Sequence, residues 1–287
     1  MLRTGPRIVR ANGVDLCVET FGDPGDPALL LIAGAAMSMD YWEDELCERL
    51  ASGARHVIRY DLRDTGQSVS YEAGAPPYRG RDFVADAVGI LDALGIDAAH
   101  IVGISMGGGT AQVLAREHPT RVRSLTLMST TAGGPGLPPP AQKLAARFAD
   151  PPPEPDWTDR EAVVDYLVDD LRAYSGTLPF DEEAQRALVE RVVARTRNIA
   201  ASTKNHWVMA TADDDPREPL RESVQRIQAP TLVLHGTEDP LFPVEHGKAL
   251  AAAIPGARFV PLDGVGHEVP PRQVWDRFVA EILDHTA

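Results

Sequence analysis

The stretch that decides the fold is residues 99–117, Ala-His-Ile-Val-Gly-Ile-Ser-Met-Gly-Gly-Gly-Thr-Ala-Gln-Val-Leu-Ala-Arg-Glu. Its first part, Ala99–Ile104, is an apolar run typical of a strand buried on both faces, and residues 108–117 have a helical pattern. The serine of Gly103-Ile-Ser105-Met-Gly107 stands between the two elements. Glycines two positions before and after a serine allow a sharp strand-to-helix turn that exposes its hydroxyl. The motif therefore predicts a serine nucleophile at a strand end.

Strand and helix patterns alternate on both sides of this stretch. Further strands are expected at 14–20, 28–33, 56–60, 122–128, 231–234 and 258–262, because apolar residues there are bounded by turn-forming residues. Further helices are expected at 42–50, 83–94, 245–254 and 273–285. Such alternation predicts an α/β fold with a mostly parallel central sheet and helices on both of its faces.

One long interval, residues 132–226, interrupts the alternation. It begins with Gly- and Pro-rich segments and then shows helical patterns at about 159–174, 181–198 and 199–211, without a buried strand. Its aromatic residues need a place to be buried, which disfavours a plain linker. We predict a helical cap, or lid, at 132–226, inserted into an α/β core formed by residues 1–131 and 227–287.

A serine nucleophile needs a base to take its proton and a carboxylate to orient that base. In this type of turn the acid and then the histidine follow later in the chain, each in a loop after a strand. Asp239 follows the expected strand 231–234 and His267 follows the expected strand 258–262. Of the eight histidines, His267 alone lies in a glycine-flanked loop after the last strand. We therefore predict Ser105, Asp239 and His267 as the catalytic residues.

Other carboxylates compete for the role of the acid. Glu238 and Asp263 are neighbours of the two loops and remain alternatives to Asp239. Some enzymes of this architecture place the acid after the preceding strand, but that strand ends here in Met128-Ser-Thr-Thr, without a carboxylate. Asp239 is therefore preferred.

An acyl-transfer reaction also needs donors for the oxyanion that develops on the substrate. The backbone amide of Met106 is one predicted donor, and the amide of Ala35, in the loop after strand 28–33, is the other. Apolar residues near that loop and in the insertion predict a substrate pocket, with ordinary core packing as the alternative for each residue. The pocket candidates are Gly34, Met37, Trp42, His206, Trp207 and Met209. This chemistry requires neither a metal nor a cofactor.

Together, Ala33-Gly34-Ala35, the run 60–68, Gly103–Gly107, Asp239 and His267 make the chain resemble an α/β-hydrolase fold enzyme over essentially its whole length. Within that superfamily it is most similar to the aclacinomycin methylesterase group, through the segments 22–31, 56–61 with 63–66, and 246–248. The resemblance implies hydrolysis of a carboxylic ester on a bulky aromatic polyketide.

Two departures from the family pattern concern the oxyanion loop. Ala33 stands where many hydrolases carry histidine, and Ala35 stands where the methylesterases carry glycine. The backbone donor is kept at Ala35, but its side chain changes the conformations open to the loop.

The same residues leave other functions open. Ser105-Met-Gly-Gly-Gly also resembles cofactor-free haloperoxidases, so perhydrolysis, acyl transfer and carbon–carbon bond hydrolysis are alternatives on one triad. A receptor that uses the capped pocket only to bind a ligand is a third class. Dehalogenases and epoxide hydrolases need a carboxylate at position 105 and are disfavoured.

Composition limits the partners and the compartment. The formal net charge of −14 disfavours nucleic acid and anionic membranes as partners. No apolar run of about 18 residues and no apolar segment typical of a signal peptide occurs. The two cysteines have neither disulfide-like nor metal-like spacing. We expect a cytoplasmic enzyme that acts on a small-molecule ester, and homo-oligomerisation stays open.

Overall fold

A central sheet dominates the computed structural model, which describes residues 2–211 and 223–287. The described strands form one eight-stranded sheet in the order β1-β2-β4-β3-β5-β6-β7-β8. Their bounds are β1 Arg3–Ala11, β2 Val14–Phe21, β3 Ala28–Ile32, β4 His56–Tyr60, β5 Ala99–Ile104, β6 Val122–Met128, β7 Thr231–Gly236 and β8 Arg258–Leu262. The β1–β2 and β2–β4 pairs are antiparallel and all other pairs are parallel. The predicted mostly parallel sheet is confirmed.

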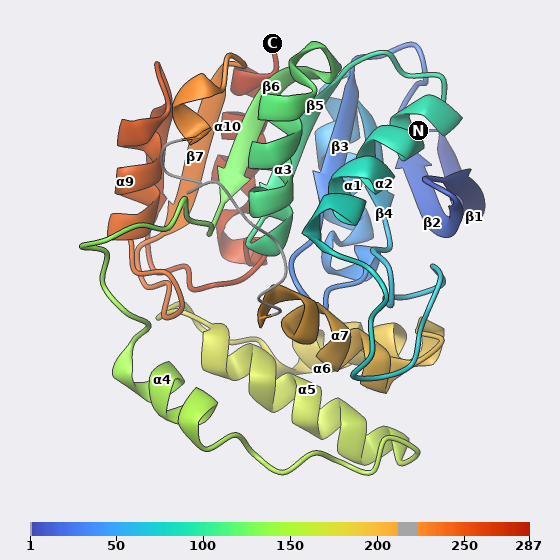
Figure 1. The fold of residues 1–287 in the computed structure, drawn as a ribbon, viewed down its shortest axis with the longest axis vertical. Helices are drawn as coiled ribbons and strands as arrows, with labels where there is room; N and C mark the ends of the chain where they lie inside the picture. Colours follow the sequence, from blue (N-terminus) through green and yellow to red (C-terminus); the bar gives the residue numbers. More distant parts are fainter. Residues whose placement is uncertain (1, 212–222) are drawn as a thin grey trace.

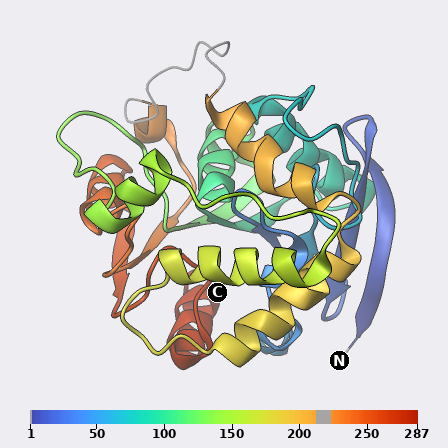
Figure 2. The same cartoon turned by 90° about the horizontal axis from the view of Figure 1, so that it is seen from below.

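Helices cover both faces of this sheet (Figures 1 and 2). On one face α1 (Asp44–Ser52) packs against α10 (Trp275–His285), and on the other α2 (Gly80–Ala93) packs against α3 (Met106–Glu117). Helix α9 (Glu245–Ala253) packs on β7 and β8. The strands β3, β4, β5 and β7 are buried along their whole length, as their continuous apolar runs predict.

The first strand, β1, was not predicted from the sequence. Its side chains are mostly exposed, and Gly5 and Pro6 interrupt any alternation of apolar and polar residues. The strand lies at the sheet edge, where a proline is tolerated, and its register with β2 shifts between Thr4 and Arg7. Asn12 and Gly13 join β1 to β2 with φ values of 45° and 73°, the conformation of a two-residue hairpin turn.

In the described part of the chain, four α-helices lie between β6 and β7 and sit over the carboxyl ends of the strands (Figure 1). They are α4 (Gln142–Ala149), α5 (Arg160–Tyr174), α6 (Glu182–Arg195) and α7 (Ile199–Thr211). Helices α5 and α6 bury a small cluster of their own around Val164, Val168 and Val189. The three predicted helices of the insertion agree with α5, α6 and α7, whereas α4 was missed. Residues 212–222 of the predicted cap lie outside the described residues.

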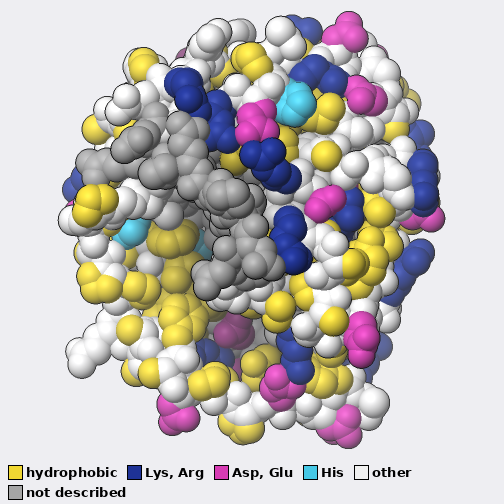
Figure 3. Space-filling model, in the orientation of Figure 1, with side chains coloured by type: hydrophobic (Ala, Val, Ile, Leu, Met, Phe, Trp, Pro, Cys, Tyr) yellow, Lys and Arg dark blue, Asp and Glu magenta, His cyan; other side chains and the backbone are white. Residues whose placement is uncertain are grey.

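The surface is mixed in character. On the face seen in Figure 3, hydrophobic side chains gather where the core meets the inserted helices. Phe148 of α4 and Trp207 of α7 have ring centroids 6.5 Å apart and are 47% and 43% exposed. Within residues 2–211 and 223–287, no helix has the length and apolar character needed to cross a bilayer.

Candidate active site

Ser105 occupies the tight turn between β5 and α3. Its φ of 53° and ψ of −118° are unusual for a residue with a side chain, and such strain is typical of a nucleophile turn. A Cβ on Gly103 would lie 2.3 Å from the Gly107 carbonyl oxygen. A Cβ on Gly107 would lie 2.4 Å from the carbonyl oxygens of Ile32 and Ala33. Gly103 is therefore required by the close packing within the turn, and Gly107 by the packing of the turn against the end of β3.

Three side chains meet at the carboxyl ends of the strands. The Nε2 atom of His267 lies 2.9 Å from the hydroxyl oxygen of Ser105. The Nδ1 atom of His267 lies 2.9 and 3.1 Å from the two carboxylate oxygens of Asp239. The three residues follow β5, β7 and β8, whose carboxyl ends share one edge of the sheet. The residues predicted as nucleophile, base and acid thus form one hydrogen-bonded chain.

The Asp239 carboxylate is held in its charged form. It is only 3% exposed and accepts hydrogen bonds from the backbone amides of Leu241 and Phe242, at 2.9 and 2.8 Å. Burial opposes ionisation, but the charge and hydrogen bonding of His267 outweigh it and keep the pKa of Asp239 below its ordinary value. The competing carboxylates Glu238 and Asp263 are exposed, and Asp263 lies 3.8 Å from Arg277.

The predicted oxyanion donors lie close to Ser105. A Cβ on Gly34 would be 3.4 Å from the Ser105 Cβ, so the loop before Ala35 passes directly beside the nucleophile. In the described part of the chain, neither the Ala35 amide nor the Met106 amide donates to a protein acceptor. Both residues line the same cavity as Ser105. Two uncommitted donors beside a hydroxyl can stabilise a developing oxyanion.

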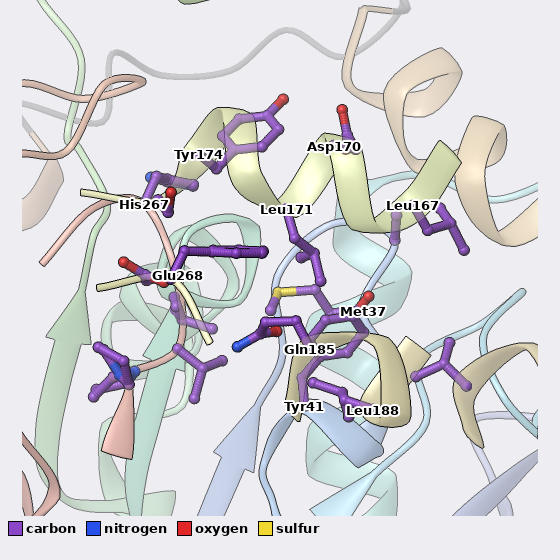
Figure 4. Close-up of a pocket in the computed structure, with 18 of the residues that line it drawn as sticks. Met37, Tyr41, Leu167, Asp170, Leu171, Tyr174, Gln185, Leu188, His267 and Glu268 are labelled. Atoms are coloured by element: carbon purple, nitrogen blue, oxygen red, sulfur yellow. The ribbon is translucent and has the colours of Figure 1, made fainter. Parts of the chain in front are cut away.

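Two cavities, of about 410 and 640 Å³, meet at this point and share Ala35, Ser105, Trp207 and Leu241 in their walls. The smaller cavity lies between the loop around Met37 and Tyr41 and the helices α5 and α6 (Figure 4). In that view Leu171 of α5 points toward Met37, and Tyr174 lies beside His267. The walls are predominantly apolar, which suits the acyl part of a hydrophobic ester.

Three of the six pocket candidates require correction. Met37 and Trp207 line the smaller cavity and Met209 lines the larger one, whereas Gly34 lines neither cavity and lies in the loop beside Ser105. Trp42 and His206 line neither cavity, and both are completely buried. Trp42 packs in the main core, whereas His206 is enclosed between α7 and the core.

Hydrogen bonds join the end of α5 and the loop after it to the His267 loop, and the sequence did not predict this contact. The backbone amide of His267 donates to the Tyr174 carbonyl at 2.8 Å. The Glu268 carboxylate accepts from the amides of Gly266 and Gly176, at 3.0 and 3.3 Å. Burial raises the pKa of Glu268, while both amide bonds oppose the shift. In the sequence, the one indication of this role for Glu268 is its position directly after His267.

Within residues 2–211 and 223–287, no cluster of His, Cys, Asp and Glu suits a metal ion.

Comparison with known proteins identifies the family. The chain belongs to the alpha/beta hydrolase fold family, which matches residues 27–271. It is 34% identical to rhodomycin D methylesterase DauP of Streptomyces sp. (strain C5), over 98% of this chain and 97% of that protein. It is 33% identical to rhodomycin D methylesterase DnrP of Streptomyces peucetius, with the same coverage. Ester hydrolysis by a serine hydrolase is the activity that these relationships support.

A solved structure shares the same architecture. The enol-lactonase from Burkholderia xenovorans LB400 superposes with a TM-score of 0.75 and 26% identity, over 97% of this chain and 99% of that one. The predicted α/β-hydrolase fold and the predicted resemblance to methylesterases are both confirmed by these comparisons.

Proposed function

We propose that this protein hydrolyses the methyl ester of a bulky, apolar carboxylic acid of the aromatic polyketide type. The observation that carries the proposal is the chain of hydrogen bonds from Asp239 through His267 to the Ser105 hydroxyl. The identity to two rhodomycin D methylesterases supports the choice of a methyl ester on a polycyclic acid.

The proposed reaction has two halves. Ser105 Oγ attacks the ester carbonyl carbon while Nε2 of His267 takes the hydroxyl proton. The amides of Ala35 and Met106 donate to the resulting oxyanion, and Asp239 stabilises the imidazolium. The intermediate collapses, methanol leaves with the proton from His267, and the acyl group stays on Ser105. Water, deprotonated by His267, then attacks the acyl-enzyme and releases the acid and the free serine.

We further propose that residues 132–226 act as a cap on a core formed by residues 1–131 and 227–287. Helices α5 and α6 contribute the apolar residues Leu167, Leu171 and Leu188 to the cavity beside Ser105. A cavity of about 410 Å³ is within the range of sites that enclose a drug-sized molecule. In this proposal Met37, Trp207 and Met209 contact the acyl group.

The test is product analysis on paired substrates. The purified protein is given the methyl ester of a tetracyclic aromatic acid and, separately, methyl acetate. The proposal predicts that free acid and methanol form in equal amounts and that kcat/KM is at least about 100-fold higher for the tetracyclic ester. Equal kcat/KM values would contradict the substrate class.

Parallel reactions with peroxide and with an acceptor alcohol separate the alternatives, because peracid or a new ester would then accumulate in place of the free acid. Ligand-dependent melting shifts without multiple turnover would favour a receptor instead.

A further inference from the structure

His206 links the inserted helix α7 to the loop that carries the predicted oxyanion donor. Its side chain is completely buried. The Nδ1 atom lies 2.9 Å from the backbone nitrogen of Ala36, and the Nε2 atom lies 2.8 Å from the carbonyl oxygen of Arg63. Both ring nitrogens are therefore committed to backbone groups of the core.

The chemistry of these partners fixes the tautomer. The Ala36 amide can only donate, so Nδ1 must accept and carry no hydrogen. The Arg63 carbonyl can only accept, so Nε2 must carry the ring hydrogen. Burial lowers the pKa of His206 to about 4, although the Arg63 carbonyl and the Asp64 charge oppose the shift. The ring is accordingly neutral near pH 7, in the form that can accept from Ala36.

The bond is made where the backbone needs support. Ala36 has a φ of 62°, in the left-handed region that is unfavourable for a residue with a Cβ. Within the loop, Met37 N donates to Gly34 O at 3.3 Å, a long hydrogen bond. The His206 acceptor thus orients the peptide group that joins Ala35 to Ala36. That group follows directly on the Ala35 amide beside Ser105.

The ring itself is held rigidly. Its centroid lies 5.2 Å from that of Phe83 and 6.3 Å from that of Tyr78, in edge-to-face arrangements. Arg63 is fixed by two hydrogen bonds of 2.7 Å to the buried carboxylate of Asp86. Because the ring is fixed, its Nδ1 acceptor in turn fixes the position of the Ala36 amide that it binds.

Asn205, which directly precedes His206 in α7, attaches this helix to the core through a second, independent set of hydrogen bonds. The Asn205 amide nitrogen donates to the Asp64 carboxylate at 2.9 Å and to the Glu72 carbonyl at 3.0 Å. Its oxygen accepts from the Gly74 amide at 2.7 Å. None of these bonds reaches the oxyanion loop, so attachment of α7 and support of Ala36 can be tested separately.

We propose that His206 is a positioning residue that acts through Ala36 to aim the Ala35 amide at the oxyanion of the reaction. The inserted helix thereby becomes part of the support of the active site. The inference rests on the proposed function, because it assigns the Ala35 amide the role of an oxyanion donor. A purely structural role for His206 is the alternative.

Two substitutions distinguish these roles. In His206→Asn the amide oxygen can occupy the place of Nδ1 and still accept from Ala36, while the bond to Arg63 is lost. In His206→Gln the amide nitrogen can occupy the place of Nε2 and still donate to Arg63, while the bond from Ala36 is lost. The two variants remove one hydrogen bond each and have similar polarity. Asn205→Ala serves as a third variant that weakens only the anchoring of α7.

The expected result is a selective loss of kcat. His206→Gln should lower kcat about 10- to 100-fold with KM nearly unchanged, because misaligned donors stabilise the transition state poorly. It should also weaken binding of phenylboronic acid, which forms a tetrahedral adduct with a serine hydroxyl. His206→Asn and Asn205→Ala should stay within about threefold of the wild-type kcat, although both lower the Tm. Equal losses of kcat in all three variants, or none in His206→Gln, would overturn the inference.

A measurement on the unaltered protein remains available if a variant does not fold. Nitrogen-15 spectra of histidine-labelled protein should show His206 with a bare Nδ1 and a protonated Nε2 at pH 7. The opposite tautomer would exclude the Ala36 bond and overturn the inference. If wild-type ester hydrolysis persisted in Ser105→Ala, the proposed function would fail instead, whatever the His206 tautomer.

Discussion

The Nε2 atom of His267 lies 2.9 Å from the Ser105 hydroxyl oxygen, although the two residues are 162 positions apart in the chain. The contact exists because β5 and β8 are parallel members of one sheet and end at the same edge. A base at this distance can take the serine proton as the hydroxyl attacks. The pair is therefore the centre of the proposed chemistry.

Replacing Asp239 with asparagine should reduce kcat on the order of 10⁴-fold, because an amide no longer stabilises the imidazolium or selects the active tautomer. The matched control is Glu238→Gln, an equivalent change at the exposed neighbouring carboxylate. Steady-state kinetics on one methyl ester should show the control within about twofold of wild type. A large loss in the control, with activity kept in Asp239→Asn, would reverse the assignment of the acid.

The glycines of the α3 turn give a test of the fold around the nucleophile. Gly107→Ala should destabilise the protein by about 2 kcal/mol or more, because the new Cβ would lie 2.4 Å from the carbonyl oxygens of Ile32 and Ala33. Gly109→Ala, two positions further along the same helix, meets no atom within 4 Å. It should be neutral or add up to about 1 kcal/mol of helix stability. Urea unfolding of both variants checks the contrast, and equal effects would refute it.

Burial of His206 should make the fold sensitive to acid. The unfolded chain takes up a proton near pH 6.5, whereas the folded protein resists protonation until about pH 4. The buried neutral ring therefore costs the folded protein no stability through its titration above about pH 6.5, and the unfolding free energy falls progressively as the pH drops from 6.5 toward 4. The full loss is on the order of 3 kcal/mol.

The sensitivity can be assigned by comparing urea unfolding at pH 7 and pH 4.5. His206→Asn, which has no titrating group at this position, should lose less stability on acidification than the wild type does. Identical losses in the two proteins would show that the acid sensitivity arises elsewhere, for example at His100, whose pKa burial also lowers to about 4.

Filling the smaller cavity should change substrate size preference. Leu171 of α5 points into this space toward Met37 (Figure 4). Leu171→Trp should raise KM for a tetracyclic methyl ester by at least about tenfold, since the larger ring occupies volume needed by the acyl group. Activity on an acetate ester, measured with the same preparation, should change little. An equal loss on both esters would indicate damage to the catalytic residues rather than to the pocket.

The core of the fold and the triad could be predicted because local patterns carry them. Apart from His100, Ala99–Ile104 is apolar, so a buried strand was expected there, and the glycines around Ser105 were expected to form a turn. Parallel strands end at one edge, and this placed Asp239 and His267 near the serine before any distance was known. The topology of the sheet therefore determines the relative positions of the three residues.

The residues that were misplaced depend on tertiary packing instead. Trp42 and His206 are apolar or aromatic residues near the expected pocket, but their side chains turn into the core, and no pattern in the chain encodes that direction. Strand β1 was not predicted because its side chains are mostly exposed and it pairs at the sheet edge. Helix α4 begins soon after a Pro-rich segment, has only Leu144 buried and lacks a side-chain cap, so its signal is weak.

The most direct test of the central claim is the rate at which Ser105→Ala protein releases methanol from a methyl ester that the wild type cleaves. The account predicts a fall in kcat on the order of 10⁵-fold or more, with an unchanged Tm. The exposed-serine variant Ser52→Ala, prepared in parallel, should keep the wild-type rate. Methanol release by Ser105→Ala at the wild-type rate would contradict the account, because no acyl-enzyme could then form on Ser105.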